Sequence, residues 1–108
     1  MCQLGRVIKE GAGTRVGWRW WDKKSERGPY WSVYYNARWS PNHRKRADGL
    51  PAQWNSVGFY AFRLKKDAMN WCKNRGRLQL GKVRVSGRLV HHALGWRAEY
   101  ATMLGAPK

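Results

Sequence analysis

The sequence predicts a single α+β domain, in which an antiparallel sheet of about five to six strands carries one amphipathic helix on one face. The 108 residues suffice for one modest hydrophobic core and are too few for two. Most apolar segments are short, rich in β-branched and aromatic residues, and separated by Gly, Pro, Asn or Asp, which is typical of antiparallel strands. Only one segment repeats its apolar residues with the period of a helix. We expect residues 1–108 to form one domain.

The first two strands are predicted to pair as a hairpin near the N-terminus. Residues 3–8 (QLGRVI) have the composition of a strand, and the KEGAGT segment that follows supplies a Gly-rich turn. Residues 15–21 (RVGWRWW) then alternate between two faces, as a half-buried strand does. One face carries Val16, Trp18 and Trp20, and the other carries Arg15, Arg19 and Trp21.

The middle of the chain combines a third strand with a long loop. A polar connection at 22–29 leads to a predicted strand at 30–35. The periodicity then disappears over residues 36–57, and a loop of this length in a compact domain is usually functional or disordered. We expect Trp39 and Trp54 to pin the ends of this basic loop to the body, while the basic run at 44–46 projects from it.

The second half of the chain predicts the helix and three more strands. Residues 58–62 (GFYAF) form a fourth strand, and residues 63–76 (RLKKDAMNWCKNRG) form the helix. Residues 81–92 form a long strand with a bulge at Gly87, and residues 96–104 return as its antiparallel partner after a short turn. The apolar face of the helix consists of Leu64, Ala68, Trp71 and Cys72.

The net charge is the strongest functional signal in the sequence. The chain has 22 Lys and Arg against 6 Asp and Glu, a formal net charge of +16. Both halves contribute, with 11 basic and 4 acidic residues in 1–54 and 11 and 2 in 55–108. Because such charge repels itself in a compact chain, the usual reason to keep it is a polyanionic partner. The 13 Arg against 9 Lys favour bidentate contacts to phosphates or carboxylates.

Several other classes of protein are disfavoured. No apolar run approaches the roughly 20 residues of a membrane-spanning helix, so we expect no membrane partner. The first residues lack the apolar region of a signal peptide, which predicts a cytoplasmic protein. Cys2 and Cys72 are most simply two reduced thiols, although a disulfide between them stays open. No zinc motif, P-loop or dinucleotide-binding motif is present, and we predict neither metal nor cofactor.

The aromatic residues present a choice between core and binding surface. Fifteen of the 108 residues are Phe, Trp or Tyr, and most are expected to form the core. However, Trp20 and Trp21 are adjacent on a strand and face opposite ways, and one helix covers only one face of a sheet. We therefore expect part of the set Trp21, Trp31, Tyr35 and Trp39 to be exposed beside arginines. Exposed aromatics interleaved with Arg are typical of proteins that bind single-stranded nucleic acid.

The basic residues of the helix, the late strand and the long loop are candidates for phosphate binding. A face that is merely solvated normally mixes charges of both signs, whereas residues 63–88 contain one acid, Asp67. Phosphate contacts set affinity and its salt dependence but carry no base sequence information. The predicted nucleic-acid-binding residues are Arg19, Trp21, Trp39, Arg44, Lys45, Arg46, Lys65, Lys66, Lys73, Arg75, Arg77, Arg84 and Arg88.

One constellation suggests catalysis. His91, His92 and Glu99 are brought together if residues 93–95 form a turn, with Glu99 near Arg88 and His91 facing Arg97. A His–Glu pair can perform general acid–base chemistry, with arginines stabilising developing charge. The plainer interpretation makes Glu99 a structural ion-pair partner and the histidines exposed turn residues. We favour the plainer interpretation and predict no catalytic residue.

The C-terminal half also resembles a family of small bacterial and phage proteins. The resemblance rests on GFYAFRLKKDAMNWC (58–72) and GKVRVSGRLVHHALGWRAEYA (81–101), and GWRAEYA at 95–101 is its most specific part. In that family an aromatic strand leads into a helix containing Asp-Ala, and a later strand turns into G-[WY]-R-A-E-Y-A. The resemblance implies an antiparallel α+β unit and a phage or mobile-element origin, and it implies no activity.

These observations lead to one functional prediction and two alternatives. The prediction is a non-enzymatic nucleic-acid-binding protein of bacterial or phage origin, which binds DNA or RNA through Arg and Lys clusters with aromatic stacking. The first alternative is a phage anti-defence inhibitor, similar to anti-CRISPR proteins, that docks on a host nucleoprotein complex. The second is a small metal-independent ribonuclease of toxin type that uses His91 or His92, Glu99 and arginines. The type of nucleic acid and the oligomeric state stay open.

Overall fold

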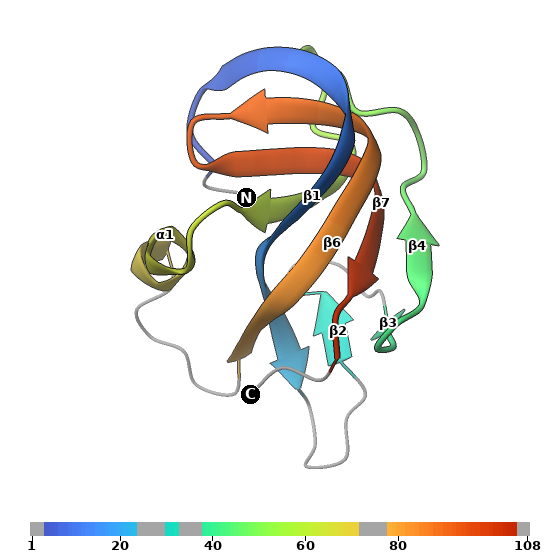
Figure 1. Cartoon of the computed structure of the whole chain (residues 1–108), viewed down its shortest axis with the longest axis vertical. Helices are drawn as coiled ribbons and strands as arrows, with labels where there is room; N and C mark the ends of the chain where they lie inside the picture. Colours follow the sequence, from blue (N-terminus) through green and yellow to red (C-terminus); the bar gives the residue numbers. More distant parts are fainter. Residues whose placement is uncertain (1–3, 24–29, 33–37, 72–77, 106–108) are drawn as a thin grey trace.

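In the computed structural model of the chain, the described residues are 4–23, 30–32, 38–71 and 78–105. These residues form a strand-dominated α+β domain with a single short helix, so the predicted fold class is confirmed in outline (Figure 1). Every strand pairing is antiparallel. The elements are β1 (Val7–Lys23), β2 (Tyr30–Ser32), β3 (Arg38–Trp39), β4 (Arg44–Arg46), β5 (Phe59–Phe62), α1 (Lys65–Trp71), β6 (Leu78–His92) and β7 (Gly95–Met103).

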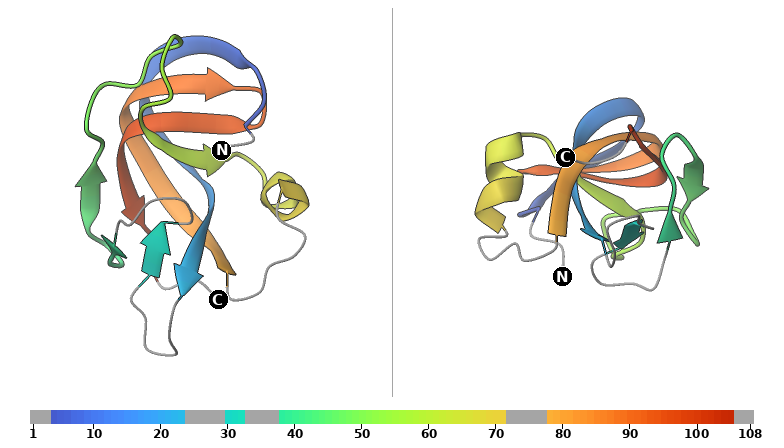
Figure 2. Two further views of the ribbon diagram at one scale, coloured as in Figure 1. Left: turned by 180° about the vertical axis from the view of Figure 1, so that it is seen from behind. Right: turned by 90° about the horizontal axis from the view of Figure 1, so that it is seen from below.

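Four of the strands close the sheet into a ring. β1 pairs with β6, β6 with β7, and β7 with β5, and β5 returns to β1 through the single pair of Trp18 with Phe62. β2 and β3 extend the sheet from β1, and β4 pairs with the end of β7. Figure 2 shows α1 on one side of this ring and β3 and β4 on the opposite side. The inner surface of the sheet is therefore covered by the sheet itself.

β1 is one long curved strand, and the predicted N-terminal hairpin is wrong. From Lys9 to Asp22, each residue of β1 has a partner on β6. The Gly-rich segment bends the strand instead of reversing it, and Gly13 lies opposite Gly87 at the bend, both with positive φ (143° and 82°). Because neither glycine carries a Cβ, the two strands can bend sharply there and stay paired.

The closed sheet creates two hydrophobic clusters and buries both tryptophans of the adjacent pair. Trp21 is fully buried inside the ring, where its ring meets that of Trp39 edge to face at 5.5 Å. Trp20 points to the other side and donates its indole N–H to the Ala68 carbonyl of α1 (2.8 Å). The prediction that Trp21 and Trp39 bind nucleic acid is wrong, because the sheet closes on itself, needs a helix on only one face and buries both indoles. Of the set expected to be exposed in part, Trp31 is half-buried and Tyr35 lies outside the described residues.

The helix begins two residues later than predicted. α1 spans Lys65–Trp71, and its turns start from the Leu64 carbonyl, which accepts the N–H groups of Asp67 and Ala68 (3.2 and 3.3 Å). Leu64 therefore precedes the helix, and its side chain is exposed and not on the packed face. Ala68 is fully buried against β1 and β5, as predicted. Cys2, Cys72 and the predicted end of the helix lie outside the described residues.

The segment predicted as a basic loop contains two strands. β3 places Trp39 in the core, which confirms that Trp39 holds one end of the segment to the body. β4 pairs Arg44, Lys45 and Arg46 with β7, so the basic run is part of the sheet and does not project from it. Trp54 is 85% exposed, and the prediction that it pins the other end is wrong.

The β6–β7 hairpin agrees with its prediction. The strands turn at residues 93–94 and pair along most of their length. The register shifts between Ser86 and Leu89, where Gly87 has a φ of 82°, so the predicted bulge is confirmed. His91 lies opposite Trp96, one residue away from its predicted partner Arg97.

Candidate nucleic-acid interface

Alternate residues of β1, β6, β7 and β4 share an open outer face of the sheet. Residues that oppose each other in an antiparallel pair point to the same side. One row contains Trp18 and Lys82, and the next contains Val16, Arg84, Thr102 and Arg44. A third row contains Thr14, Ser86, Tyr100 and Arg46. We call these residues, together with Lys65 of α1, the basic face.

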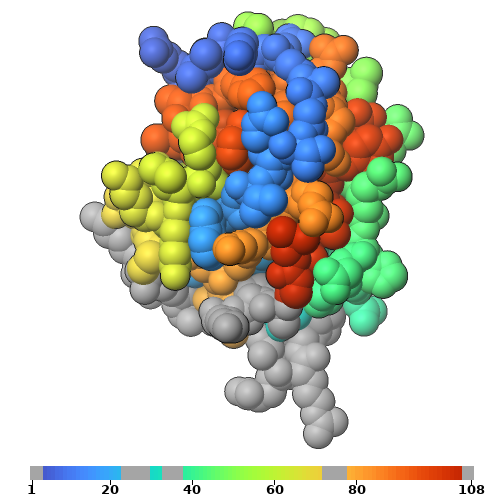
Figure 3. All heavy atoms as spheres, in the orientation of Figure 1, coloured from blue at the N-terminus to red at the C-terminus, as the bar shows by residue number. Residues whose placement is uncertain are grey.

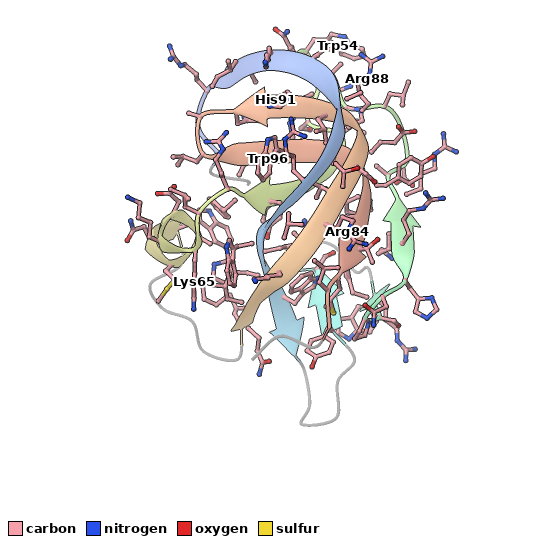
Figure 4. The ribbon with its side chains drawn as sticks, viewed as in Figure 1. Trp54, Lys65, Arg84, Arg88, His91 and Trp96 are labelled. Atoms are coloured by element: carbon pink, nitrogen blue, oxygen red, sulfur yellow. The ribbon has the colours of Figure 1, made fainter. Side chains whose placement is uncertain are left out.

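The basic face is a continuous surface formed by segments that are distant in the sequence. Figure 3 views it directly and shows atoms of α1, β1, β6, β7 and β4 side by side. In Figure 4, Lys65 and Arg84 lie on this near side of the molecule. The apolar side chain of Val16 is left 51% exposed beside Arg84, on a row otherwise formed by polar residues. The face thus offers cations and accessible carbon surface together.

Two partly exposed aromatic rings of the basic face are flanked by cations. The Lys65 and Lys82 ammonium groups lie 5.3 and 5.6 Å from the centre of the Trp18 ring. The Arg44 guanidinium lies 4.5 Å from the centre of the Tyr100 ring. These distances are within the range of cation–π attraction. The basic face thus places cations and aromatic rings next to one another at two points.

The acids near the basic face are bound at its margin. The Glu99 carboxylate lies 3.7 Å from Arg46 Nε and accepts the backbone N–H of Arg88 (3.2 Å), which supports the bulge. The Glu10 carboxylate lies 3.2 Å from Arg88 Nη1. Within the described part of the chain, Lys65, Lys82, Arg84 and Arg44 form no ion pair with a carboxylate. The four cations of the central face are therefore available to an anionic ligand.

Arg19 does not look outward as predicted. Its side chain is 3% exposed, and its guanidinium lies 4.1 Å from the Tyr60 ring centre and 4.8 Å from that of Trp39. It donates to the Tyr60 carbonyl (3.0 Å) and to Ser32 Oγ (3.4 Å). The alternation of β1 is as predicted, but the face that carries Arg19 is the inner face of the ring. Arg19 has a structural role, and Arg19, Trp21 and Trp39 offer no surface to a ligand.

The other predicted site residues divide into three groups. Arg44, Lys65 and Arg84 lie on the basic face, with Arg46 and Arg88 at its margin, and Lys66 is exposed on α1. Lys45 turns away from the face, because its ammonium donates to the Arg38 carbonyl (2.9 Å) and lies 5.5 Å from the centre of the Trp39 ring. Lys73, Arg75 and Arg77 lie outside the described residues.

Seven members of the basic face were not predicted, namely Lys82, Trp18, Tyr100, Val16 and the small polar residues Thr14, Ser86 and Thr102. Lys82 was detectable, because the alternation of the KVRV segment places it on the same side of the strand as Arg84. Trp18 and Tyr100 carry no sequence signal for a surface site, because most of the aromatic residues are expected in the core. Val16 carried no signal, since only its register opposite Arg84 leaves it on the open side.

Both ring nitrogens of His92 are hydrogen-bonded to other parts of the chain. His92 Nε2 accepts the Arg97 Nε–H (3.0 Å), which leaves the proton on Nδ1 to be donated to the Gly5 carbonyl (2.9 Å). Burial, with a smaller effect of Arg97, lowers the pKa of His92 against the opposing effect of its bond to Gly5. Both ring nitrogens of His92 are therefore engaged in the neutral form.

His91 lies among cations at one end of the ring. Partial burial, and then the positive charges of Lys9, Arg15 and Arg63, lower its pKa. Two of these cations have backbone partners, since Arg63 donates to the Ala93 and His92 carbonyls (2.9 and 3.3 Å) and Arg15 to the Thr14 carbonyl (2.9 Å). This cluster was not predicted as a site, and two of its three cations are already engaged by backbone carbonyls.

In the described residues, no helix is long and apolar enough to cross a membrane, and no three His, Cys, Asp or Glu side chains gather as metal ligands do. Comparison of the chain with protein-family models found no match, and searches of curated proteins and of solved structures likewise found none.

Proposed function

We propose that the protein binds single-stranded nucleic acid on its basic face. The observation that carries the proposal is the position of Trp18 between Lys65 and Lys82, on a sheet surface that continues through Arg84 to Arg44 and Tyr100. Proteins that bind single strands combine a positively charged path for the backbone with aromatic rings on which bases stack. Both parts are present here on one face.

The hydrogen bonds and ion pairs of the cations favour the basic face as the binding surface over the cation cluster around His91. Lys65, Lys82, Arg84 and Arg44 of the basic face have no carboxylate partner among the described residues. In the cation cluster around His91, by contrast, Arg63 and Arg15 donate to backbone carbonyls. A phosphate chain gains most where the cations are not already engaged. Duplexes keep their bases stacked inside, so partly exposed aromatic rings on an open sheet favour unpaired bases.

The test is a binding titration with a matched pair of charge-removal variants. Fluorescence anisotropy of labelled single-stranded DNA and RNA oligonucleotides is measured with the wild type, with Lys82→Gln/Arg84→Gln, and with Arg6→Gln/Lys9→Gln. Both variants lose one exposed Lys and one exposed Arg, but of the second pair Arg6 directly precedes β1 and Lys9 lies near its start, away from the basic face.

We expect the basic-face variant to lose about tenfold in affinity at moderate salt, because two of its phosphate contacts are gone. The control variant should lose much less. Equal losses in both variants would show that only the total charge matters, and no binding to either oligonucleotide at low salt would end the proposal. A markedly tighter complex with duplex than with single strands would also contradict it.

A further inference from the structure

The loop between β4 and β5 holds an exposed tryptophan on a rigid frame. The frame is centred on the buried guanidinium of Arg97, which reaches across from β7. Arg97 donates to the carbonyls of Ala52 and Val57 (both 2.8 Å) and to Asn55 Oδ1 (3.2 Å). Hydrogen bonds from a charged group are stronger than those between neutral groups, so these contacts fix the path of the loop.

A second set of hydrogen bonds fixes the turn itself. Asn55 Oδ1 also accepts the backbone N–H groups of Ala52 and Val57 (both 3.1 Å), and Asn55 Nδ2 donates to the Leu50 carbonyl (3.3 Å). Pro51 is fully buried beneath the turn. Loops with this many internal contacts present their side chains in a defined direction. The backbone on both sides of Trp54 is therefore held in place.

Trp54 points into solvent at the tip of this frame. Its side chain is 85% exposed, the largest exposure of any large hydrophobic residue in the described part of the chain. A tryptophan buries a large apolar area when it packs, so leaving one in water forgoes that stabilisation. A rigid loop that displays an unpacked indole is a feature of a contact surface more than of a core.

The surroundings of Trp54 connect it to the cations of β6. The Glu10 carboxylate accepts the backbone N–H of Gln53 (3.1 Å) and, through its other oxygen, binds Arg88 Nη1 (3.2 Å). The residue before Trp54 is thus joined through one carboxylate to Arg88, whose side chain is 46% exposed. Figure 4 shows Trp54 and Arg88 at the same end of the molecule, beyond Arg84 along β6. An exposed indole therefore lies at the same end of the molecule as Arg88, at the margin of the basic face.

We propose that Trp54 stacks on an unpaired nucleobase at the end of the strand that the basic face binds, with Arg88 at the adjoining phosphate. This inference rests on the proposed function and adds a second base-binding position to Trp18. Nucleobases stack on indole rings irrespective of sequence, and a neighbouring guanidinium suits the phosphate of the same nucleotide. A second copy of this chain is a poor occupant, since each copy carries a net charge of +16.

The experiment compares Trp54→Ala, Trp54→Phe and Leu50→Ala in the anisotropy titration with single-stranded oligonucleotides. Leu50 is 54% exposed in the same loop and serves as the matched control for removing an apolar side chain. We expect Trp54→Ala to lose about tenfold or more in affinity, which corresponds to the loss of one base stack. Its dependence on salt concentration should stay that of the wild type, because no phosphate contact is removed.

Trp54→Phe supplies the direct readout. It should retain most of the affinity, because phenylalanine also stacks, while the quenching of tryptophan emission by the oligonucleotide becomes smaller than in the wild type. Wild-type affinity in Trp54→Ala overturns this inference and leaves the proposed function standing. Equal losses in Trp54→Ala and Leu50→Ala also overturn it, since the loop would then act without a specific stack. Failure of the wild type to bind any single strand overturns both proposals.

Discussion

The dependence of binding on salt concentration can be predicted from the number of cations on the basic face. Lys65, Lys82, Arg84 and Arg44 are the cations of that face without a carboxylate partner in the described residues. Each phosphate neutralised on a single strand contributes about 0.7 to the slope of log K against log salt. If each of these four cations neutralises one phosphate, together they contribute about −2.8 to the slope. Replacing Lys82 and Arg84 by glutamine then makes the slope less steep by about 1.4.

The assay is an anisotropy titration with one single-stranded oligonucleotide at several salt concentrations, for the wild type and the variant. Both replaced side chains are exposed on the outer face of β6, so the variant is expected to fold as the wild type does, and circular dichroism checks this. A variant whose slope equals that of the wild type would refute the reasoning. So would a wild-type slope near zero, because the cations would then make no phosphate contacts.

Three further predictions concern the stability of the fold that carries the basic face. Gly17→Ala should lower the free energy of unfolding by about 2 kcal/mol or more in urea denaturation, because the new Cβ would lie 2.5 Å from the Phe62 carbonyl oxygen where β5 meets β1. Gly49→Ala, whose new Cβ would only make an ordinary contact with Val57 Cγ1 at 3.7 Å, should be nearly neutral, and equal effects would contradict this account. Arg19→Lys should cost about 2 kcal/mol through its lost stacking and hydrogen bonds, yet bind oligonucleotides like the wild type when folded; weaker binding at unchanged stability would restore the sequence-based site assignment. The free energy of unfolding should fall as the pH drops below about 6.5, because the unfolded His92 gains a proton there while the folded ring, with its lowered pKa, does not; a His92→Gln variant with the same pH dependence would refute this.

The second half of the fold was predictable because its signals are local. The alternation in β6, the positive φ required at Gly87 and the short turn before β7 all concern residues that are close in the sequence. The end of the strand at 58–62 and the start of the helix were also close to their predicted positions. Periodicity and turn residues are enough for such elements.

The N-terminal half was predicted less well because its partners are distant in the sequence. A Gly-rich segment has the same sequence signature in a turn that reverses the chain and in a bend within one strand. Only the pairing with β6 distinguishes the bend from the turn. The burial of Trp21 depends on closure of the sheet, which a single pair between Trp18 and Phe62 completes. No local pattern announces that contact. Trp21 would be exposed if the sheet were open and covered by one helix, but the sheet is closed and Trp21 lies inside it.

The candidate site shows the same division. The cations at 65 and 84 were predicted from charge alone, whereas the aromatic members needed the register that sets Trp18 opposite Lys82 and Tyr100 opposite Ser86. The basic run at 44–46 was identified, but it was expected to project from a loop. In the structure it forms β4, which pairs with β7 and directs Lys45 toward Trp39. Charge identifies which residues are candidates, and pairing decides which of them face the same way.

The most direct test of the account maps the interface residue by residue. Two-dimensional NMR of the isotope-labelled protein is recorded during titration with a single-stranded oligonucleotide. We predict that the indole N–H signal of Trp18 and the amide signals of Lys82, Arg84 and Thr102 shift together, while the indole signals of the buried Trp21 and Trp39 stay in place. Shifts confined to the ring-end cluster around His91, or no shifts at all, would contradict the assignment of the basic face as the nucleic-acid-binding surface.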